Sequence, residues 1–231
     1  MEIIAEIGQN HNGDIELARR LIHAAKESGA DVAKFQLYDA RLLFSREGNP
    51  WFDYNCATEL SREDVEVLNR TCDEAGIEFM ASVFDVERVA WLEAVGVKRY
   101  KLASRSVRDR ALIDAVVDTG KPVLVSLGMW NETEFPAIPA SEVGYLYCIS
   151  KYPTPLEDLY LGKVDFTQYA GFSDHSIGIS AAVAALARGA GLIEKHFTLD
   201  KTMHGPDHEG SMTPDELRNL ANFREDFRQC L

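Results

Sequence analysis

Three histidines lie close together in IEKHFTLDKTMHGPDHEG, residues 193–210, with acidic side chains among them. Imidazole and carboxylate groups are common metal ligands, so this stretch is either a metal site in itself or one edge of a larger site. His204 and His208 have the i, i+4 spacing of a helical zinc pair, but a Gly-Pro-Asp sequence separates them and indicates a loop. We therefore expect neither of these two histidines to be a metal ligand.

His196 has a better partner in His175. The runs YAGFSDHS, residues 169–176, and GAGLIEKHF both have the composition of buried strands, and each carries one of these histidines near its end. Neighbouring strands lie about 5 Å apart, so the two imidazoles could hold a divalent ion that keeps positions open for water or substrate oxygen. The alternative is that one of them is a core histidine hydrogen-bonded to its surroundings.

A repeated pattern supplies these strands. In five places a helix-like amphipathic segment ends at glycine and a β-rich run follows, as in SGADVAKFQ, AGIEFMASV, VGVKRYKLAS, TGKPVLVSLG and GAGLIEKHF. Three further runs, IIAEIG, VGYLYCIS (143–150) and YAGFSDHS, bring the candidate strands to eight. Eight alternating units predict the α/β class and a (β/α)8 TIM barrel, with residues 1–231 as one domain. A doubly wound open sheet is the alternative, but no GxGxxG follows the first strand.

Helical patterns lie between most of the candidate strands. Residues 14–28 show the pattern best, because their apolar residues share one face and Gly29 closes the segment. WNETEFPAIPASE, between the fifth and sixth strands, is too short for a full helix and contains two prolines. Residues 38–61 form a long insert with three aromatic residues at positions 51, 52 and 54, which either covers the barrel mouth or packs on its rim.

Polar side chains fall late in every candidate strand, on the face that side-chain alternation assigns to one side of the sheet. In barrel enzymes the carboxyl ends of the strands carry the chemistry. In strand order the residues are Glu6, Lys34, Gln36, Ser82, Lys101, Ser126, Ser150, Tyr152, Ser173, His175, Glu194 and His196.

Lys34 and Lys101 stand within the apolar runs VAKFQ and YKLAS, where an unpaired ammonium group would cost several kcal/mol to bury. We favour an anion-binding role over a structural ion pair. Ser82 and Ser126 alone would be read as core hydroxyls, but beside two lysines they could line a phosphate or carboxylate site.

The bulk composition excludes some classes of partner. With 37 acidic and 24 basic side chains the formal net charge is −13, so nucleic acids and anionic membrane surfaces are not expected to bind. The four cysteines are far apart and lack zinc-site spacing, and no stretch of eighteen uncharged apolar residues occurs. We expect reduced thiols, no export signal and a cytoplasmic location.

Several motifs in order resemble one family. IAEIGQNHNGD, GADVAKFQ, KLAS, VSLGM, YPTPLEDL, GFSDHSIG and EKHFTLDKTMHGPDH together resemble the barrel domain of the N-acetylneuraminate (sialic acid) synthases and of the enzymes that make pseudaminic and legionaminic acids. The resemblance covers nearly the whole chain.

The resemblance implies a transferase that condenses phosphoenolpyruvate with a sugar aldehyde, N-acetylmannosamine or a relative of it. The product is a 3-deoxy-2-keto sugar acid, and phosphate is released. In the family, the histidines matching His175 and His196 bind a divalent ion, usually manganese, with magnesium and cobalt as alternatives, and the ion polarises the aldehyde. Glu194 matches a carboxylate that directs water onto the cationic carbon. Glu6 is expected to handle protons or to orient a lysine.

The family pattern also assigns substrate contacts. Phosphoenolpyruvate is expected at Lys34, Lys101, Ser104, Ser126 and Ser173, joined by Ser82 and Ser150. The sugar is expected at Gln36, Tyr152 and Asp207.

Two departures from the family pattern leave other functions open. Ser106 stands where the family usually carries a substrate-facing glutamate, and the antifreeze-like C-terminal domain of full-length sialic acid synthases is not expected in residues 1–231. Homodimers are typical of the family, so a homodimer is one expectation here. The alternatives are a catalytically idle barrel that binds a sugar or a partner protein, and a metal-dependent aldolase that uses pyruvate itself.

Overall fold

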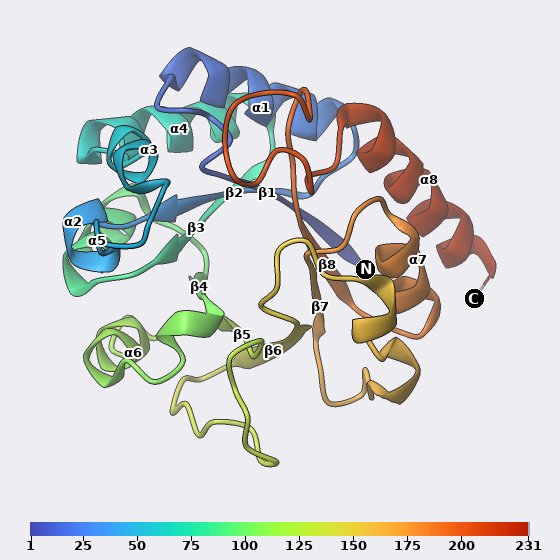
Figure 1. Cartoon of the computed structure of the whole chain (residues 1–231). Helices are drawn as coiled ribbons and strands as arrows, with labels where there is room; N and C mark the ends of the chain where they lie inside the picture. Colours follow the sequence, from blue (N-terminus) through green and yellow to red (C-terminus); the bar gives the residue numbers. More distant parts are fainter. Residues whose placement is uncertain (231) are drawn as a thin grey trace.

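Eight parallel strands close into one barrel, in which each strand pairs with the next along the chain and the last pairs with the first (Figure 1). The computed structural model describes residues 1–230. The predicted (β/α)8 TIM barrel is therefore confirmed, with all eight strands at the expected runs. The strands are β1 (Glu2–Gly8), β2 (Val32–Leu37), β3 (Glu78–Val83), β4 (Tyr100–Leu102), β5 (Val123–Ser126), β6 (Val143–Cys148), β7 (Gly171–Asp174) and β8 (Leu192–His196).

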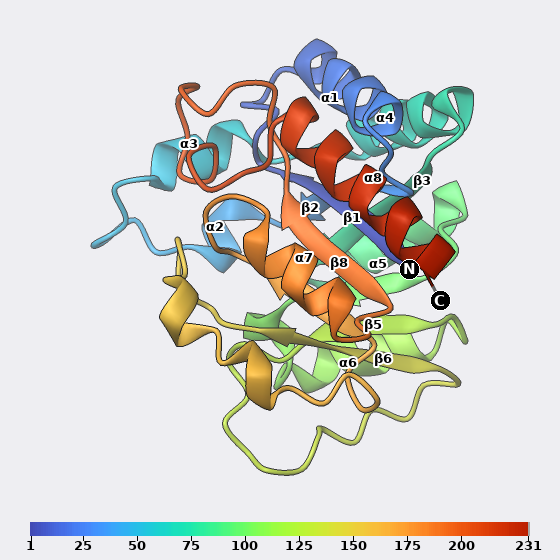
Figure 2. The same cartoon turned by 90° about the vertical axis from the view of Figure 1, so that its right-hand side faces the viewer.

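Helices surround the barrel, and Figure 2 shows α7 and α8 lying beside β8. No helix within residues 1–230 is both long enough and apolar enough to cross a membrane. The helices are α1 (Ile15–Glu27), α2 (Ala40–Leu43), α3 (Phe52–Ala57), α4 (Arg62–Ala75), α5 (Val86–Val95), α6 (Arg110–Val117), α7 (Ser180–Ala187) and α8 (Pro214–Cys230). Three short 3-10 turns add η1 (Ser104–Ser106), η2 (Leu156–Asp158) and η3 (Leu161–Lys163).

The ends of α1 follow from its sequence. The Asp14 carboxylate accepts hydrogen bonds from the backbone N–H groups of Glu16 and Leu17, which have no partner inside the helix. Gly29 follows the helix with φ of 96°, and a Cβ there would lie 2.6 Å from the Cβ of Ala221 in α8. Glycine is therefore required twice at this position, by the backbone conformation and by the close approach of α8.

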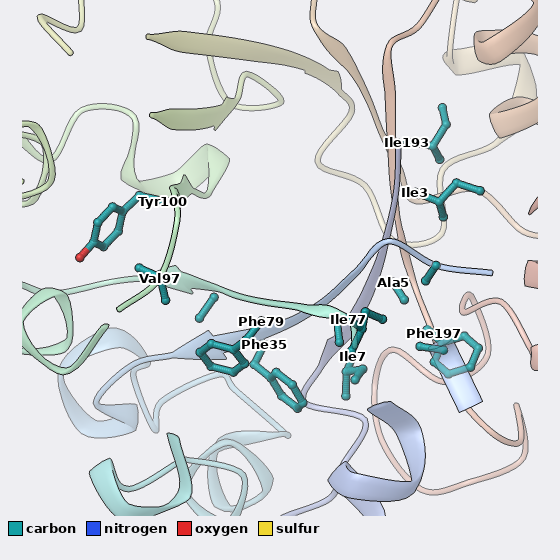
Figure 3. Packing of buried hydrophobic residues seen from close by; sticks show 14 of the residues in the cluster. Ile3, Ala5, Ile7, Phe35, Ile77, Phe79, Val97, Tyr100, Ile193 and Phe197 are labelled. Carbon is teal, nitrogen blue, oxygen red and sulfur yellow. The ribbon is translucent and has the colours of Figure 1, made fainter. Parts of the chain in front are cut away.

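The barrel wall has an apolar layer on each face. Outward-facing residues of the strands, among them Ile3, Phe35 and Phe79, pack against the helices in the large cluster drawn in Figure 3. A smaller cluster fills the lower half of the barrel interior, and most of its members stand two residues before a polar candidate residue on the same strand. Its members are Ile4, Val32, Met80, Leu124, Leu146 and Leu192. This inner layer closes the barrel below the candidate site.

Two of the eight units lack an α-helix. Within the described residues, β5 is joined to β6 by irregular chain, as we expected from the two prolines in this short segment. The connection from β6 to β7 consists of turns that include η2 and η3. Aromatic rings pack in this sector instead. The ring of Phe135 lies 4.8 Å from those of Tyr145 and Tyr169, measured between centroids, and Tyr147 is 5.6 Å from Tyr169.

The insert at residues 38–61 packs on the rim of the barrel mouth. It contains α2 and α3, and the Tyr54 hydroxyl donates to the carbonyl oxygen of Gln9, in the loop after β1. The Trp51 ring lies 5.3 Å from the ring of His204, in the loop after β8. The insert therefore ties together the loops that follow β1 and β8, and its residues Leu43 and Phe44 border the mouth itself.

The loop after β1 contains a buried neutral histidine that should make stability depend on pH. Burial lowers the pKa of His11 from 6.5 to about 4, against the raising effects of Asp64 and Asp14. The His11 imidazole takes up a proton more readily in the unfolded chain than in the folded chain. The stability that depends on a neutral His11 is therefore complete above pH 6.5, falls as the pH decreases, and is lost near pH 4.

We expect His11→Asn to remove this dependence, which amounts to roughly 3 kcal/mol for a shift of about 2.5 pH units. Urea unfolding of both proteins at several pH values between 7.5 and 4 checks it. The wild-type chain should lose more free energy of unfolding than the variant, and equal losses would refute the assignment.

Candidate active site

All the candidate residues from the sequence line one cavity of about 590 Å³ at the carboxyl ends of the strands. The side chains come from strands or loops all around the barrel, so the stretch 193–210 is one edge of the site. The candidates lining the cavity are Glu6, Lys34, Gln36, Ser82, Lys101, Ser104, Ser126, Ser150, Tyr152, Ser173, His175, Glu194, His196 and Asp207.

The strand register brings these residues side by side. Ser82 of β3 pairs with Gln36 of β2 and with Lys101 of β4, and Glu194 of β8 pairs with Ser173 of β7. Because neighbouring residues in register point to the same face of a sheet, these candidates face one another across their strand pairs. The alternation of side chains that located them in the sequence is therefore confirmed.

Two lysines and two glutamates form the floor of the cavity. The Lys34 ammonium lies 2.7 Å from Glu6 Oε2 and 3.4 Å from Glu194 Oε2, and Lys101 lies 3.5 Å from Glu194 Oε1. These side chains are at most 7% exposed. The structural ion pair weighed against an anion-binding role is thus present for both lysines, and it balances their charges with two carboxylates.

Serine hydroxyls complete the floor. Lys34 donates to Ser82 Oγ at 3.1 Å, Lys101 donates to Ser126 Oγ at 2.7 Å, and Ser173 donates to Glu194 Oε1 at 2.7 Å. Each lysine is therefore held by a carboxylate and a hydroxyl together. The hydroxyls can turn toward a ligand because their hydrogen rotates about the C–O bond.

Electrostatic coupling fixes the charge of Glu194. Burial alone would raise its pKa, but Lys101, Lys34 and the hydrogen bond from Ser173 outweigh burial and lower the pKa to about 2. Burial works against the charge of Lys34, yet Glu194 and Glu6 raise its pKa above the usual value. The pKa of Lys101 is lowered, because burial and the charge of Lys34 together exceed the effect of Glu194. Glu194 is a carboxylate at neutral pH.

His175 and His196 face each other above this floor, with ring centroids 6.1 Å apart, close to the separation expected from neighbouring strands. His175 Nδ1 lies 2.8 Å from the carbonyl oxygen of Ile149, so Nδ1 carries a hydrogen and Nε2 is the nitrogen that could offer a lone pair to a metal. The Tyr152 ring packs on the His175 ring, with 4.1 Å between their centroids. His196 Nδ1 is buried and has no hydrogen-bond partner among the described residues.

These two imidazoles fit a divalent ion. One has its tautomer fixed by a backbone carbonyl, as is usual for metal-bound histidine, and the other has an orphaned buried nitrogen. Residues 1–230 contain no cluster of three or more histidine, cysteine, aspartate or glutamate side chains arranged to hold a metal. An ion here would keep several positions for water or substrate, the arrangement of catalytic sites.

His204 and His208, the other two histidines of residues 193–210, contact neighbouring side chains outside the cavity. His208 is buried, with Nδ1 2.7 Å from Thr198 Oγ1 and Nε2 3.1 Å from Asn12 Oδ1. His204 packs against Trp51. Neither belongs to the cavity lining.

The turn after β4 contributes Arg105 to the mouth. Ser106 stands where the family usually carries a substrate-facing glutamate, and here it is buried in η1 and does not line the cavity. Its neighbour Arg105 lines the cavity instead, donates to the carbonyl oxygen of Leu43 at 3.2 Å and lies 5.4 Å from the Phe44 ring centroid. Arg105 has the same parity as Lys101 of β4, whereas Ser106 has the other parity.

Other lining residues were missed in the sequence. Cys148 stands two residues before Ser150 and two after Leu146, so the same alternation could have found it. Gln9 and Phe44 lie in loops, where no period exists to mark them. They border a second cavity of about 480 Å³ that continues outward from the first, between the insert and the loop after β8, and Arg105 and Asp207 line both.

Comparisons with known proteins agree with this geometry. The model of the NeuB family matches residues 21–231. The N,N'-diacetyllegionaminic acid synthase of Legionella pneumophila is 36% identical over an alignment of 258 positions, which covers 99% of this chain and 72% of the relative. The N-acetylneuraminate-9-phosphate synthase of Homo sapiens is 35% identical over an alignment of 243 positions, which covers 95% of this chain and 68% of the relative.

A solved structure shows the same architecture. The N-acetylneuraminic acid (sialic acid) synthetase of Leptospira borgpetersenii, crystallised with citrate, matches with a TM-score of 0.91 and 33% identity, over 99% of this chain and 84% of that one. The family model, the two relatives and this structure all extend over nearly the whole barrel and its cavity. The chain therefore belongs to the NeuB family of synthase enzymes.

Proposed function

We propose that this protein condenses phosphoenolpyruvate with a sugar aldehyde to form a 3-deoxy-2-keto sugar acid of the sialic acid type and inorganic phosphate. The observation that carries the proposal is the floor of the cavity, where Lys34 and Lys101, each bonded to a serine hydroxyl, flank the Glu194 carboxylate below a pair of histidines. Relatives named as sialic, legionaminic and pseudaminic acid synthases support the reaction class.

The floor suits the anionic substrate. Lys34 with Ser82 and Lys101 with Ser126 present ammonium and hydroxyl donors together, and Ser104, Ser150 and Ser173 line the same space. Charged donors in a site closed to water bind phosphate and carboxylate oxygens strongly. We assign the phosphate and carboxylate of phosphoenolpyruvate to these groups.

Charge balance supports a divalent cation. Glu6 and Glu194 already neutralise the two lysines, so a multiply charged anion needs further positive charge nearby. His175 and His196 would hold the ion, and we propose manganese, with magnesium or cobalt as alternatives. When bound, such an ion acts as a Lewis acid on the aldehyde oxygen.

Glu194 is placed to act as a general base. In the condensation the methylene carbon of phosphoenolpyruvate forms a bond to the aldehyde carbon, whose oxygen takes up a proton and becomes a hydroxyl. Water then adds to the cationic carbon that remains and loses one proton to Glu194. As the second proton leaves, the ketone forms and the bond from this carbon to the phosphate oxygen breaks, so that phosphate departs with the bonding electrons. The two protons of the water balance those taken up by the hydroxyl and the phosphate. Glu194 is a carboxylate whose Oε2 lies 3.4 Å from the Lys34 ammonium but accepts no hydrogen bond from the described residues, so this oxygen can take a proton from the water. Glu6, against Lys34, orients that lysine.

The sugar is assigned to the outer part of the cavity. Gln36 donates its amide hydrogen to Glu6 Oε1 at 2.9 Å, which leaves the amide oxygen free to accept from a sugar hydroxyl. Tyr152 and Asp207 lie on the same lining, and Arg105 stands where the two cavities meet. We propose that the end of the aldehyde farthest from its carbonyl enters the second cavity.

Phosphate release tests the reaction. With manganese, phosphoenolpyruvate and a panel of hexosamine and neutral sugar aldehydes, we expect at least one aldehyde to give phosphate. Glu194→Gln should lower kcat about 100- to 10,000-fold because it removes the base. Glu225→Gln, on the exposed side of α8, is the matched control and should leave the rate unchanged.

The proposal would be contradicted if none of the aldehydes gave phosphate release above background. It would also be contradicted if Glu194→Gln released phosphate at the wild-type rate. Replacing phosphoenolpyruvate with pyruvate in the same mixture separates the aldolase alternative, which forms product without phosphate.

Ligand binding tests the assignment of the floor. We expect Lys101→Met to weaken phosphoenolpyruvate binding about 10- to 100-fold, the loss typical of one charged hydrogen bond. Calorimetry in the presence of manganese measures the affinity, and thermal unfolding confirms that the variant is folded.

Lys121→Met replaces a lysine outside the cavity, paired with Glu93, and should bind like the wild type. Equal affinity in the wild type and Lys101→Met would show that Lys101 serves only the structural ion pair.

A further inference from the structure

A second, separate ion pair lies immediately next to the two candidate metal histidines. Asp174 precedes His175 at the end of β7, Lys195 precedes His196 in β8, and the two preceding residues pair in register. The Lys195 ammonium lies 3.1 Å from Asp174 Oδ2, and the side chains are 1% and 0% exposed. Because side chains alternate along a strand, this pair occupies the face of the sheet opposite the histidines.

Ser176 closes the network on the other side of His175. Asp174 Oδ1 accepts hydrogen bonds from the Ser176 backbone N–H at 2.8 Å and from its hydroxyl at 2.7 Å. Lys195 donates to the Ser176 carbonyl oxygen as well. The residues on both sides of His175 are therefore bonded to each other, and one lysine ties them to the strand that carries His196.

This network begins where the strand pairing stops. The ladder between β7 and β8 ends at Asp174 and Lys195, so His175 lies beyond the last paired residue of its strand. Its own backbone carbonyl accepts from Thr154, in the loop after β6, and not from β8. Among the side chains of the described residues, the Asp174–Lys195 pair is the ionic link that joins the two histidine-bearing segments.

Stability alone does not account for a pair in this place. The two side chains are 0% and 1% exposed, so both charges are held away from water. Replacing a buried ion pair with apolar side chains of similar volume is often neutral or stabilising, whereas removing one partner alone is strongly destabilising. A buried pair that only filled space could have been replaced by such side chains.

We propose that Asp174 and Lys195 are positioning residues that fix His175 relative to His196 and thereby set the affinity of the site for a divalent ion. The inference rests on the metal site of the proposed function and adds to it an ion pair whose side chains lie on the opposite face of the two strands. It assigns the outer face of β7 and β8 a role in the chemistry of the inner face.

The test separates positioning from stability. Asp174→Asn combined with Lys195→Met removes both charges, and the asparagine oxygen can still accept from Ser176. We expect the double variant to unfold at a urea concentration close to that of the wild type. Its affinity for manganese, measured by calorimetry on metal-free protein, should fall about 10- to 100-fold, as for other groups that orient metal ligands.

Lys195→Met alone leaves Asp174 buried without its partner and should be the less stable protein. Adding Asp174→Asn should then restore stability without restoring manganese affinity. This split between the two measurements is not expected from a purely structural pair, for which both would recover together.

A matched control neutralises a pair at the opposite end of the barrel. Arg224 of α8 binds Asp31, which precedes β2. Asp31→Asn with Arg224→Met should bind manganese like the wild type, whatever its stability.

The outcomes distinguish this proposal from the one on which it rests. A wild-type chain that binds no manganese overturns the metal site and the positioning role together. Wild-type binding with equal affinity in the double variant overturns the positioning role alone.

If the double variant does not fold, Asp174→Asn by itself is the milder substitution, because Lys195 keeps its bond to the Ser176 carbonyl. Weaker manganese binding with an unchanged circular dichroism spectrum then supports the proposal, and unchanged binding refutes it.

Discussion

The charge-balanced cluster of Lys34, Lys101, Glu6 and Glu194 is the constraint around which the site is built. Buried ammonium groups need partners, and here each lysine is held by both a carboxylate and a serine hydroxyl from a neighbouring strand. The layer of apolar side chains below the cluster closes the barrel to water, which strengthens every electrostatic interaction above it. A strand out of register would leave a charge unpaired, so the closure of the barrel and the integrity of the site depend on the same contacts.

Much of this arrangement could be predicted from the sequence. Alternation along a strand is a fixed geometric rule, and it placed polar candidates such as Lys34, Ser126 and Glu194 in one cavity without knowledge of any contact. The rule cannot be applied in loops, which supply Gln9 and Phe44 to the same cavity. The resemblance to the family added roles, which periodicity cannot provide.

The second cavity and the Asp174–Lys195 pair could not be predicted, for two different reasons. The cavity is formed by loops distant in sequence, where no period relates position to direction. The pair needs the register between β7 and β8, since only the observed pairing places Lys195 opposite Asp174. Both residues stand on the face that alternation assigned to the protein core, where a charge without known partner gives no indication of its purpose.

The sector after β5 and β6 shows that the barrel closes without an α-helix in every unit. Within the described residues, β5 and β6 are the strands not followed by an α-helix, and aromatic rings such as Phe135 and Tyr169 pack there.

The loops after β5 and β6 still deliver Ser150 and Tyr152 to the cavity, the latter against His175. The residues that bind and react are set by the strand ends, and the helix that normally returns the chain to the next strand is a packing element that other apolar groups can replace. For β7 and β8 the situation is different, because both faces of these strands are committed: the inner face to Glu194 and the histidines, and the outer face to the ion pair that ties their backbones together. A unit without an α-helix is therefore compatible with the site after β5 and β6, whereas changes to β7 or β8 would be costly.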